Sequence, residues 1–109
     1  METPDITFEY YSENHELTEA LKAKVEQRIQ KLAKKQRDIT GVSVAVQQVE
    51  HSHTPHAYRA RVVIYHKPEN VVATEVAPTV QEALLNALDS VERQVREQRR
   101  KLRERWKRP

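Results

Sequence analysis

Hydrophobic and polar residues alternate in four short stretches of the chain, and hydrophobic residues recur at steps of three and four in two longer ones. Alternation is typical of half-buried strands, because neighbouring side chains point to opposite faces of a sheet. Steps of three and four are typical of a helix with one apolar side. The pattern predicts the order strand, helix, three strands, helix, with strands at 6–11, 42–50, 57–65 and 71–77.

A threonine precedes each of the two predicted helices. Thr18 is suited to cap the first helix, because its hydroxyl can accept a hydrogen bond from a backbone amide of the first turn. Thr79 is followed three residues later by Glu82, which is the spacing of a capping box. The apolar positions are Leu21, Val25, Ile29 and Leu32 in the first helix, and Val80, Leu84, Ala87, Leu88, Val91, Val95 and Leu102 in the second.

The connectors carry two further signals. Gly41, the only glycine, ends the connector after the first helix and is the one residue that adopts a positive φ without steric cost. Residues 51–56 are predicted to form a loop, because Pro55 lacks the amide that a strand needs. Which side of the strand 71–77 is buried stays open at this point.

These elements predict an α+β fold of order β-α-β-β-β-α, similar to double-stranded-RNA-binding domains. We expect a four-stranded, mostly antiparallel sheet with two helices packed on one face, because both apolar stripes need the same sheet surface. With 109 residues, the chain has the length of one domain with one core. The domain is expected to span 1–109, with a core at 5–105 and a frayed tail at 106–109.

Positive charge is concentrated in the two predicted helices. Residues 1–17 contain five acids and no lysine or arginine, whereas 18–37 contain seven basic residues and 79–109 contain nine. At helical spacing many of these bases line one side of their helix. The first cationic row is Lys24, Arg28, Lys31 and Lys35, and the second cationic row is Arg93, Arg96, Arg100, Arg103 and Lys107.

Two neighbouring helices on one sheet face would join these rows into a single basic surface, which suits the phosphates of RNA or DNA. The plainer interpretation is two solvated helices with internal ion pairs. Glu92, Glu97 and Glu104 are the acids available for such pairs, but Glu97 and Glu104 lie on a separate flank of the helix. The sequence therefore favours a nucleic-acid partner.

Other polar and aromatic residues carry weaker signals. Arg59, Arg61 and Tyr65 share the side of their strand that faces away from the core, where they either contact RNA or are solvated. Trp106 either stacks on a base or packs at the end of the helix.

No metal, cofactor or catalytic residue is expected. The chain has no cysteine, which excludes disulfides and thiolate ligands. His51, His53 and His56 lie close together but without a nearby pair of carboxylates, so they are expected to gain charge below a pH of about 6.5 rather than bind metal. No catalytic triad or glycine-rich phosphate loop is present. No signal peptide or membrane-spanning stretch is evident, which predicts a cytoplasmic protein.

Two segments resemble a known family. The run ELTEALK at 16–22, continued by VEQRIQKL at 25–32, is similar to the first helix of the ribosome hibernation promoting factors, also called ribosome-associated inhibitors or sigma-54 modulation proteins. The run ALDSVERQVR at 87–96 resembles the second helix of that family. The order of the elements also agrees, and the resemblance covers about residues 5–105.

The chain departs from the family pattern where the second helix begins. The family usually has an Asp, a nearby Tyr and an Ala-Ala-Ile-Asp run there, whereas this chain has Thr79, Gln81 and the run EALL at 82–85. Contacts made by that Tyr or those acids are therefore not carried over. No second domain is evident, and in this respect the chain resembles a short form of the family.

The resemblance implies a non-enzymatic stress-response factor that inhibits translation by occupying the mRNA–tRNA channel of the small ribosomal subunit. It also implies a partner in ribosomal RNA and a protein that is monomeric when free. Two alternatives remain: a free double-stranded RNA-binding module, and a regulator whose basic helix docks on an acidic protein. The residues predicted to contact phosphates are Lys24, Arg28, Lys31, Lys35, Arg93, Arg96, Arg100 and Arg103.

Overall fold

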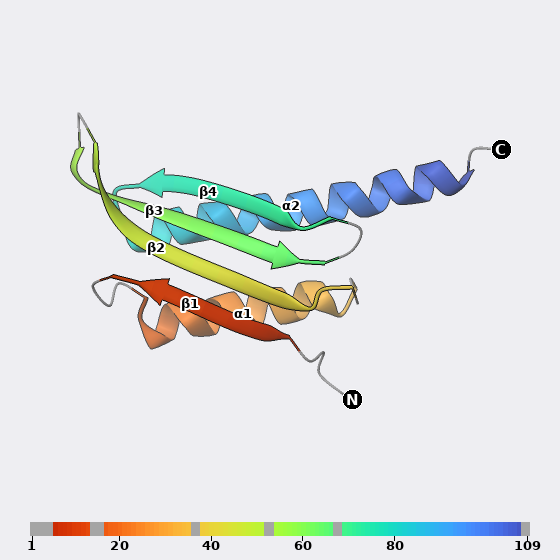
Figure 1. Ribbon diagram of the computed structural model, residues 1–109, viewed down its shortest axis with the longest axis horizontal. Coiled ribbons are helices and arrows are strands. Elements are labelled where there is room, and N and C mark those ends of the chain that lie inside the picture. Colours follow the sequence, from red (N-terminus) through yellow and green to blue (C-terminus); the bar gives the residue numbers. More distant parts are fainter. Residues whose placement is uncertain (1–5, 14–16, 36–37, 52–53, 67–68, 108–109) are drawn as a thin grey trace.

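The chain forms one four-stranded sheet with two helices behind it, as a computed structural model shows (Figure 1). The structure describes residues 6–13, 17–35, 38–51, 54–66 and 69–107. The predicted α+β fold and its element order are confirmed. The elements are β1 (Thr7–Ser12), α1 (Glu19–Ala33), β2 (Gly41–His51), β3 (Thr54–Tyr65), β4 (Val71–Ala77) and α2 (Val80–Lys107).

The strands lie in the order β1-β2-β3-β4, which is also their order along the chain. β1 and β2 are parallel, and the two following pairs are antiparallel. A parallel pair cannot be joined by a tight turn, and α1 provides the crossover between β1 and β2. The sheet is therefore mostly antiparallel, as predicted.

The core lies between the sheet and the two helices. The predicted alternation is confirmed in β2 and β3, and β4 buries Val71, Ala73 and Ala77, which settles the side that the sequence left open. Both helices bury their apolar side against the same face of the sheet (Figure 1). The fully buried residues of largest volume are Val25, Ile29, Val42, Val44, Val46, Val62, Ile64, Leu84, Leu88, Val91 and Val95.

Threonines cap both helices as predicted. The Thr18 hydroxyl accepts a hydrogen bond from the Leu21 amide at 3.2 Å. The Thr79 hydroxyl accepts one from the Glu82 amide at 3.1 Å. These bonds satisfy amides that have no partner within the helix and define where each helix begins.

The region 51–56 differs from the predicted loop. β2 continues to His51 and β3 begins at Thr54, so the loop prediction is wrong for the described part of this region. The register passes from the pair Val49 and Ala57 to the pair His51 and Thr54, with an irregularity between them. Pro55 lies on the longer side of this bulge, where a strand tolerates the missing amide.

Gly41 is used differently from the expectation. It is the first residue of β2 and has extended backbone, so a positive φ is not required there. A Cβ atom at Gly41 would stand 3.4 Å from the Thr7 carbonyl oxygen and 3.4 Å from Cδ2 of Tyr65. Both separations are at the short end of ordinary van der Waals contact, so a Cβ would touch the Tyr65 ring on the face of the sheet opposite the helices.

Side chains from both helices attach them to the outer strands. The Gln94 side-chain amide of α2 donates hydrogen bonds to the Val72 carbonyl oxygen of β4 at 3.0 Å and to Ser90 Oγ at 3.3 Å. The Tyr10 hydroxyl of β1 donates to the Lys22 carbonyl oxygen of α1 at 3.4 Å. The Lys22 ammonium lies 5.4 Å from the centroid of the Tyr10 ring, within the range of a cation–π contact.

Replacing Thr79 by alanine is expected to lower the free energy of unfolding by about 1 kcal/mol, because the Glu82 amide loses its partner. Thr79→Ser keeps the hydroxyl and is the matched control. Urea denaturation followed by circular dichroism measures both. Equal losses in the two variants would show that the hydroxyl does not act as a cap.

Tyr10 is expected to make stability depend on alkaline pH. Burial, and next the nearby charge of Glu26, raise the pKa of Tyr10 above its ordinary value of 10.0. The folded state therefore keeps a proton that the unfolded chain releases, and stability present below pH 10 is lost as the pH rises further. Melting temperatures measured from about pH 8 to about pH 11 should fall less steeply for Tyr10→Phe. Parallel profiles would contradict this account.

Candidate nucleic-acid interface

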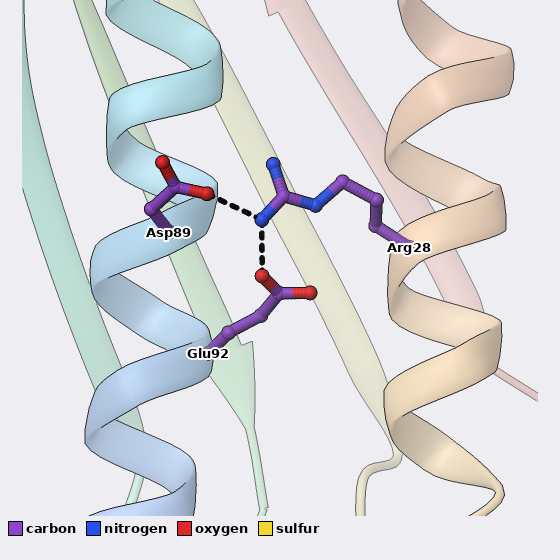
Figure 2. A network of polar contacts seen from close by, with 3 residues as sticks. All are labelled: Arg28, Asp89 and Glu92. Atoms are coloured by element: carbon purple, nitrogen blue, oxygen red, sulfur yellow. Dashed lines mark hydrogen bonds and ion pairs between the residues drawn. The ribbon is translucent and has the colours of Figure 1, made fainter.

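The two helices meet through one ion-paired cluster on their facing sides. Arg28 extends from α1 across the space between the helices to Asp89 and Glu92 of α2 (Figure 2). Nη2 of Arg28 donates to Oδ1 of Asp89 at 2.6 Å and also to Oε2 of Glu92. One guanidinium nitrogen therefore serves both carboxylates.

The cluster forms because of where its residues lie on their helices. Arg28 precedes the fully buried Ile29, at the margin of the apolar side of α1. Asp89 and Glu92 are three residues apart, so they lie on one side of α2. When the two apolar sides pack on the sheet, these margins come together.

The environment differs between the three side chains. The exposed fraction of the side chain is 28% for Arg28, 67% for Asp89 and 16% for Glu92. Burial alone would lower the pKa of Arg28, but the hydrogen bonds to Glu92 and Asp89 outweigh it and raise that pKa. The guanidinium stays charged, and two carboxylates compensate its charge.

The remaining predicted phosphate contacts are exposed. Lys24 and Lys31 lie on α1, and Lys35 follows directly after it. Arg93, Arg96, Arg100 and Arg103 lie on α2. In the part of the chain that the structure describes, none of these seven takes part in an ion pair. The side chains of Trp106 and Lys107 lie outside the described residues.

Acids of α2 do not neutralise the second cationic row within the described residues. Glu92, which the plainer interpretation pairs with an arginine of its own helix, pairs with Arg28 of α1 instead. Glu97 and Glu104 form no ion pair with Arg93, Arg96 or the other described members of the row. The four members of the row whose side chains the structure describes present their charges to solvent.

The last turns of α2 extend past the sheet (Figure 1). A helix of 28 residues is about 42 Å long, which is most of the longest dimension of the molecule, 54 Å. Val95 is the last residue of α2 that is buried, within the described side chains. Arg100 and Arg103 therefore lie on a part of the helix that the sheet does not cover.

Sequence reasoning missed the partners of Arg28. It placed Arg28 in the first cationic row and gave it the same role as the lysines of that row. Position on one helix could not show which of these cations would pair with an acid of the other helix. The available signal was the three-residue spacing of Asp89 and Glu92, but using it requires the packing of one helix against the other. The prediction that Arg28 contacts phosphate stays a prediction, and its two carboxylate partners give it a second role as a link between the helices.

Metal ligand groups and membrane-spanning helices are both absent from the described residues. Within the described residues, no group of three or more His, Cys, Asp or Glu side chains could hold a metal ion. The side chains of His51, His53 and His56 lie outside those residues. No described helix has both the length and the apolar character that crossing a membrane requires.

The family model for the sigma 54 modulation protein / S30EA ribosomal protein family matches residues 8–103. The chain belongs to this family, which confirms the resemblance drawn from the two helices. The match includes both cationic rows except Lys107. No curated protein matches the chain.

Solved structures share the fold. The N-terminal domain of Protein Y from Thermus thermophilus has a TM-score of 0.68 and 21% sequence identity, over 84% of this chain and 96% of that one. A ribosomal subunit interface protein from Coxiella burnetii has a TM-score of 0.67 and 8% identity, over 85% of this chain and 97% of that one. The fold is thus shared although few residues are identical.

A double-mutant cycle should separate the two ion pairs of Arg28. With Arg28→Met and Glu92→Gln, we expect a coupling energy of about 1 kcal/mol, because Glu92 is mostly buried. With Arg28→Met and Asp89→Asn, we expect less than about 0.5 kcal/mol, because Asp89 is mostly solvated. Urea denaturation of the three single variants, the two double variants and the wild type gives both values. A coupling through Asp89 as large as that through Glu92 would contradict the assignment.

Proposed function

We propose that this protein is a ribosome-associated inhibitor of translation that sits in the mRNA–tRNA channel of the small ribosomal subunit. The observation that carries the proposal is the set of exposed cations along two helices that pack on one face of the sheet and share one ion-paired cluster. Membership of the S30EA ribosomal protein family supports a ribosomal partner. The name of the Coxiella burnetii protein with the same fold, a ribosomal subunit interface protein, points the same way.

The geometry supports one basic surface made from both helices. Asp89 lies one turn before Arg93 on the same side of α2, and Arg28 belongs to the first cationic row. The ion pair between Arg28 and Asp89 therefore brings the flanks that carry the two rows toward a common seam. Cations on both sides of this seam are spaced by helical turns and can meet successive phosphates of folded RNA.

Inhibition then follows from occupancy alone. The folded domain fills space that mRNA and tRNA need, and its lysines and arginines replace their contacts with ribosomal RNA. Phosphate contacts position a protein but read no base sequence, so selectivity for the ribosome comes from the shape of the channel. No cofactor and no chemical step is needed, and the protein acts as a monomer in the cytoplasm.

Reversing one cation in each row should abolish binding to ribosomes. For Lys31→Glu/Arg100→Glu we expect loss of co-sedimentation with small subunits in a sucrose gradient, because both sides of the seam lose attraction for phosphate. The matched control is Lys34→Glu/Lys101→Glu, which changes the net charge equally at two exposed lysines that belong to neither cationic row. The control should retain most of the binding.

Salt dependence provides a second measurement on the wild type. If about six phosphates are contacted, affinity should fall by about a thousandfold between about 50 and about 200 mM salt, with duplex DNA as the guide.

Equal loss of binding in the two charge-reversal variants, test and control, would show that only net charge matters and would reject the proposed surface.

The same preparations separate the two alternative functions. A free double-stranded RNA-binding module would bind naked duplex RNA as tightly as ribosomes. A regulator that docks on an acidic protein would keep its partner after nuclease treatment. Either result would contradict the ribosomal proposal.

A further inference from the structure

The face of the sheet opposite the helices, here called the open face, is uncovered (Figure 1). Within the described residues, all four large apolar or aromatic side chains that are exposed project from this face. Their exposed fractions are 57% for Tyr11, 40% for Tyr65, 42% for Val72 and 44% for Val76. Exposed rings on an uncovered face of a sheet are available to a partner.

Small residues of β2 separate the two exposed tyrosines on the open face. Tyr11 is on β1 and Tyr65 on β3, whereas β2 between them presents Gly41, Ser43 and Ala45 to the open face. The Tyr65 ring lies next to Gly41, where an added Cβ would be 3.4 Å from Cδ2 of the ring. The Tyr11 hydroxyl donates to Oε2 of Glu9 at 3.1 Å, which orients that ring along β1. These three small residues and the two tyrosine rings are here called the platform.

The charge of the platform is positive. Arg61 lies in the cross-strand line of Tyr11, Ala45 and Thr74, and Arg59 lies in the next line, beside Gln47 and Val76. Both arginines are exposed, and neither has an ion pair in the described part of the chain. Glu9 is the only acid that the described strand residues present to this face, and its carboxylate accepts the Tyr11 hydroxyl.

We propose that the open face binds unpaired nucleotides of single-stranded RNA. Tyr65 and Tyr11 stack on bases, and Arg59 and Arg61 contact the adjoining phosphates. An unpaired base has a free flat side for an aromatic ring, whereas bases in a duplex are already stacked. Tyr11 pairs with Ala45 and Tyr65 with Gly41, so the two tyrosines are offset by two strands and four positions along β2. Their Cα atoms are therefore about 16 Å apart, a span of a few nucleotides. This contact is on the side of the sheet away from the cationic helices, and it does not require the ribosomal proposal to be correct.

The test measures, by fluorescence anisotropy, the affinity of the full chain for two labelled oligonucleotides of about eight nucleotides. One is oligouridylate, and the other is an abasic ribose-phosphate strand of equal charge. The ratio of the two affinities isolates the contribution of the bases. We expect the wild type to bind oligouridylate at least about tenfold more tightly, from about one stacked base or more.

The variants assign this ratio to the open face. Tyr65→Ala and Tyr11→Ala should each lower the ratio by about fivefold or more, whereas Tyr65→Phe, which keeps the ring, should retain it. Lys31→Glu/Arg100→Glu should weaken both strands alike and leave the ratio unchanged. A failure of the ribosomal proposal would thus appear in the sucrose gradient and not in this ratio.

Three results would overturn the inference, and the third applies where an alanine variant does not fold. Equal affinity of the wild type for both strands would show that bases are not bound, and would leave the open face to a protein partner. An unchanged ratio in both alanine variants would place the bases elsewhere. If an alanine variant does not fold, amide chemical shifts of the wild type decide: we expect oligouridylate to shift amides at 41–45 and 59–65, and shifts confined to α1 and α2 would reject the site.

Discussion

The arrangement depends on the burial of two apolar helix sides against one face of one sheet. Val25 and Ile29 of α1, and Leu88 and Val91 of α2, are fully buried. Replacing one such leucine by alanine typically costs about 2–5 kcal/mol, whereas an exposed ion pair contributes about 0–1 kcal/mol. Burial rather than ion pairing therefore decides where the helices lie. The polar sides of the helices have no alternative but solvent, and the positions of the lysines and arginines follow from the positions of the hydrophobic residues.

The cluster of Arg28, Asp89 and Glu92 refines this arrangement without creating it. Its contribution to stability is small, but a charged hydrogen bond to a mostly buried carboxylate has a preferred geometry. It favours one rotation of α1 relative to α2 over others that would bury the same apolar area. It also places two carboxylates within a surface that is otherwise cationic, so the attraction for phosphate is strongest beside the seam rather than at its centre. An RNA backbone would follow the flanks of the helices.

The sequence predicted the fold well because each element carries a local signal. The alternation of Val42, Val44 and Val46 and the caps at Thr18 and Thr79 involve only neighbours in the chain. The predictions failed at 51–56, where the bulge beside Pro55 depends on pairing between strands. For the candidate site, periodicity predicted which residues share a helix side, and the structure places seven of the eight in solvent without ion pairs among the described residues. Arg28 pairs with Asp89 and Glu92, which lie 61 and 64 positions further along the chain. No local pattern encodes contacts over such a separation.

The projecting end of α2 has a further consequence for how the helix responds to its surroundings. Arg96 and Arg100 are four residues apart, and Arg103 follows after three more, so neighbouring turns carry like charges. Such pairs weaken a helix by about 0.2–0.5 kcal/mol each, and here no sheet lies underneath to offset them. A polyanion laid along these turns would remove the repulsion at the same time as it binds. Helix formation and ligand binding are thus thermodynamically coupled at this end of the molecule, and ionic strength acts on both.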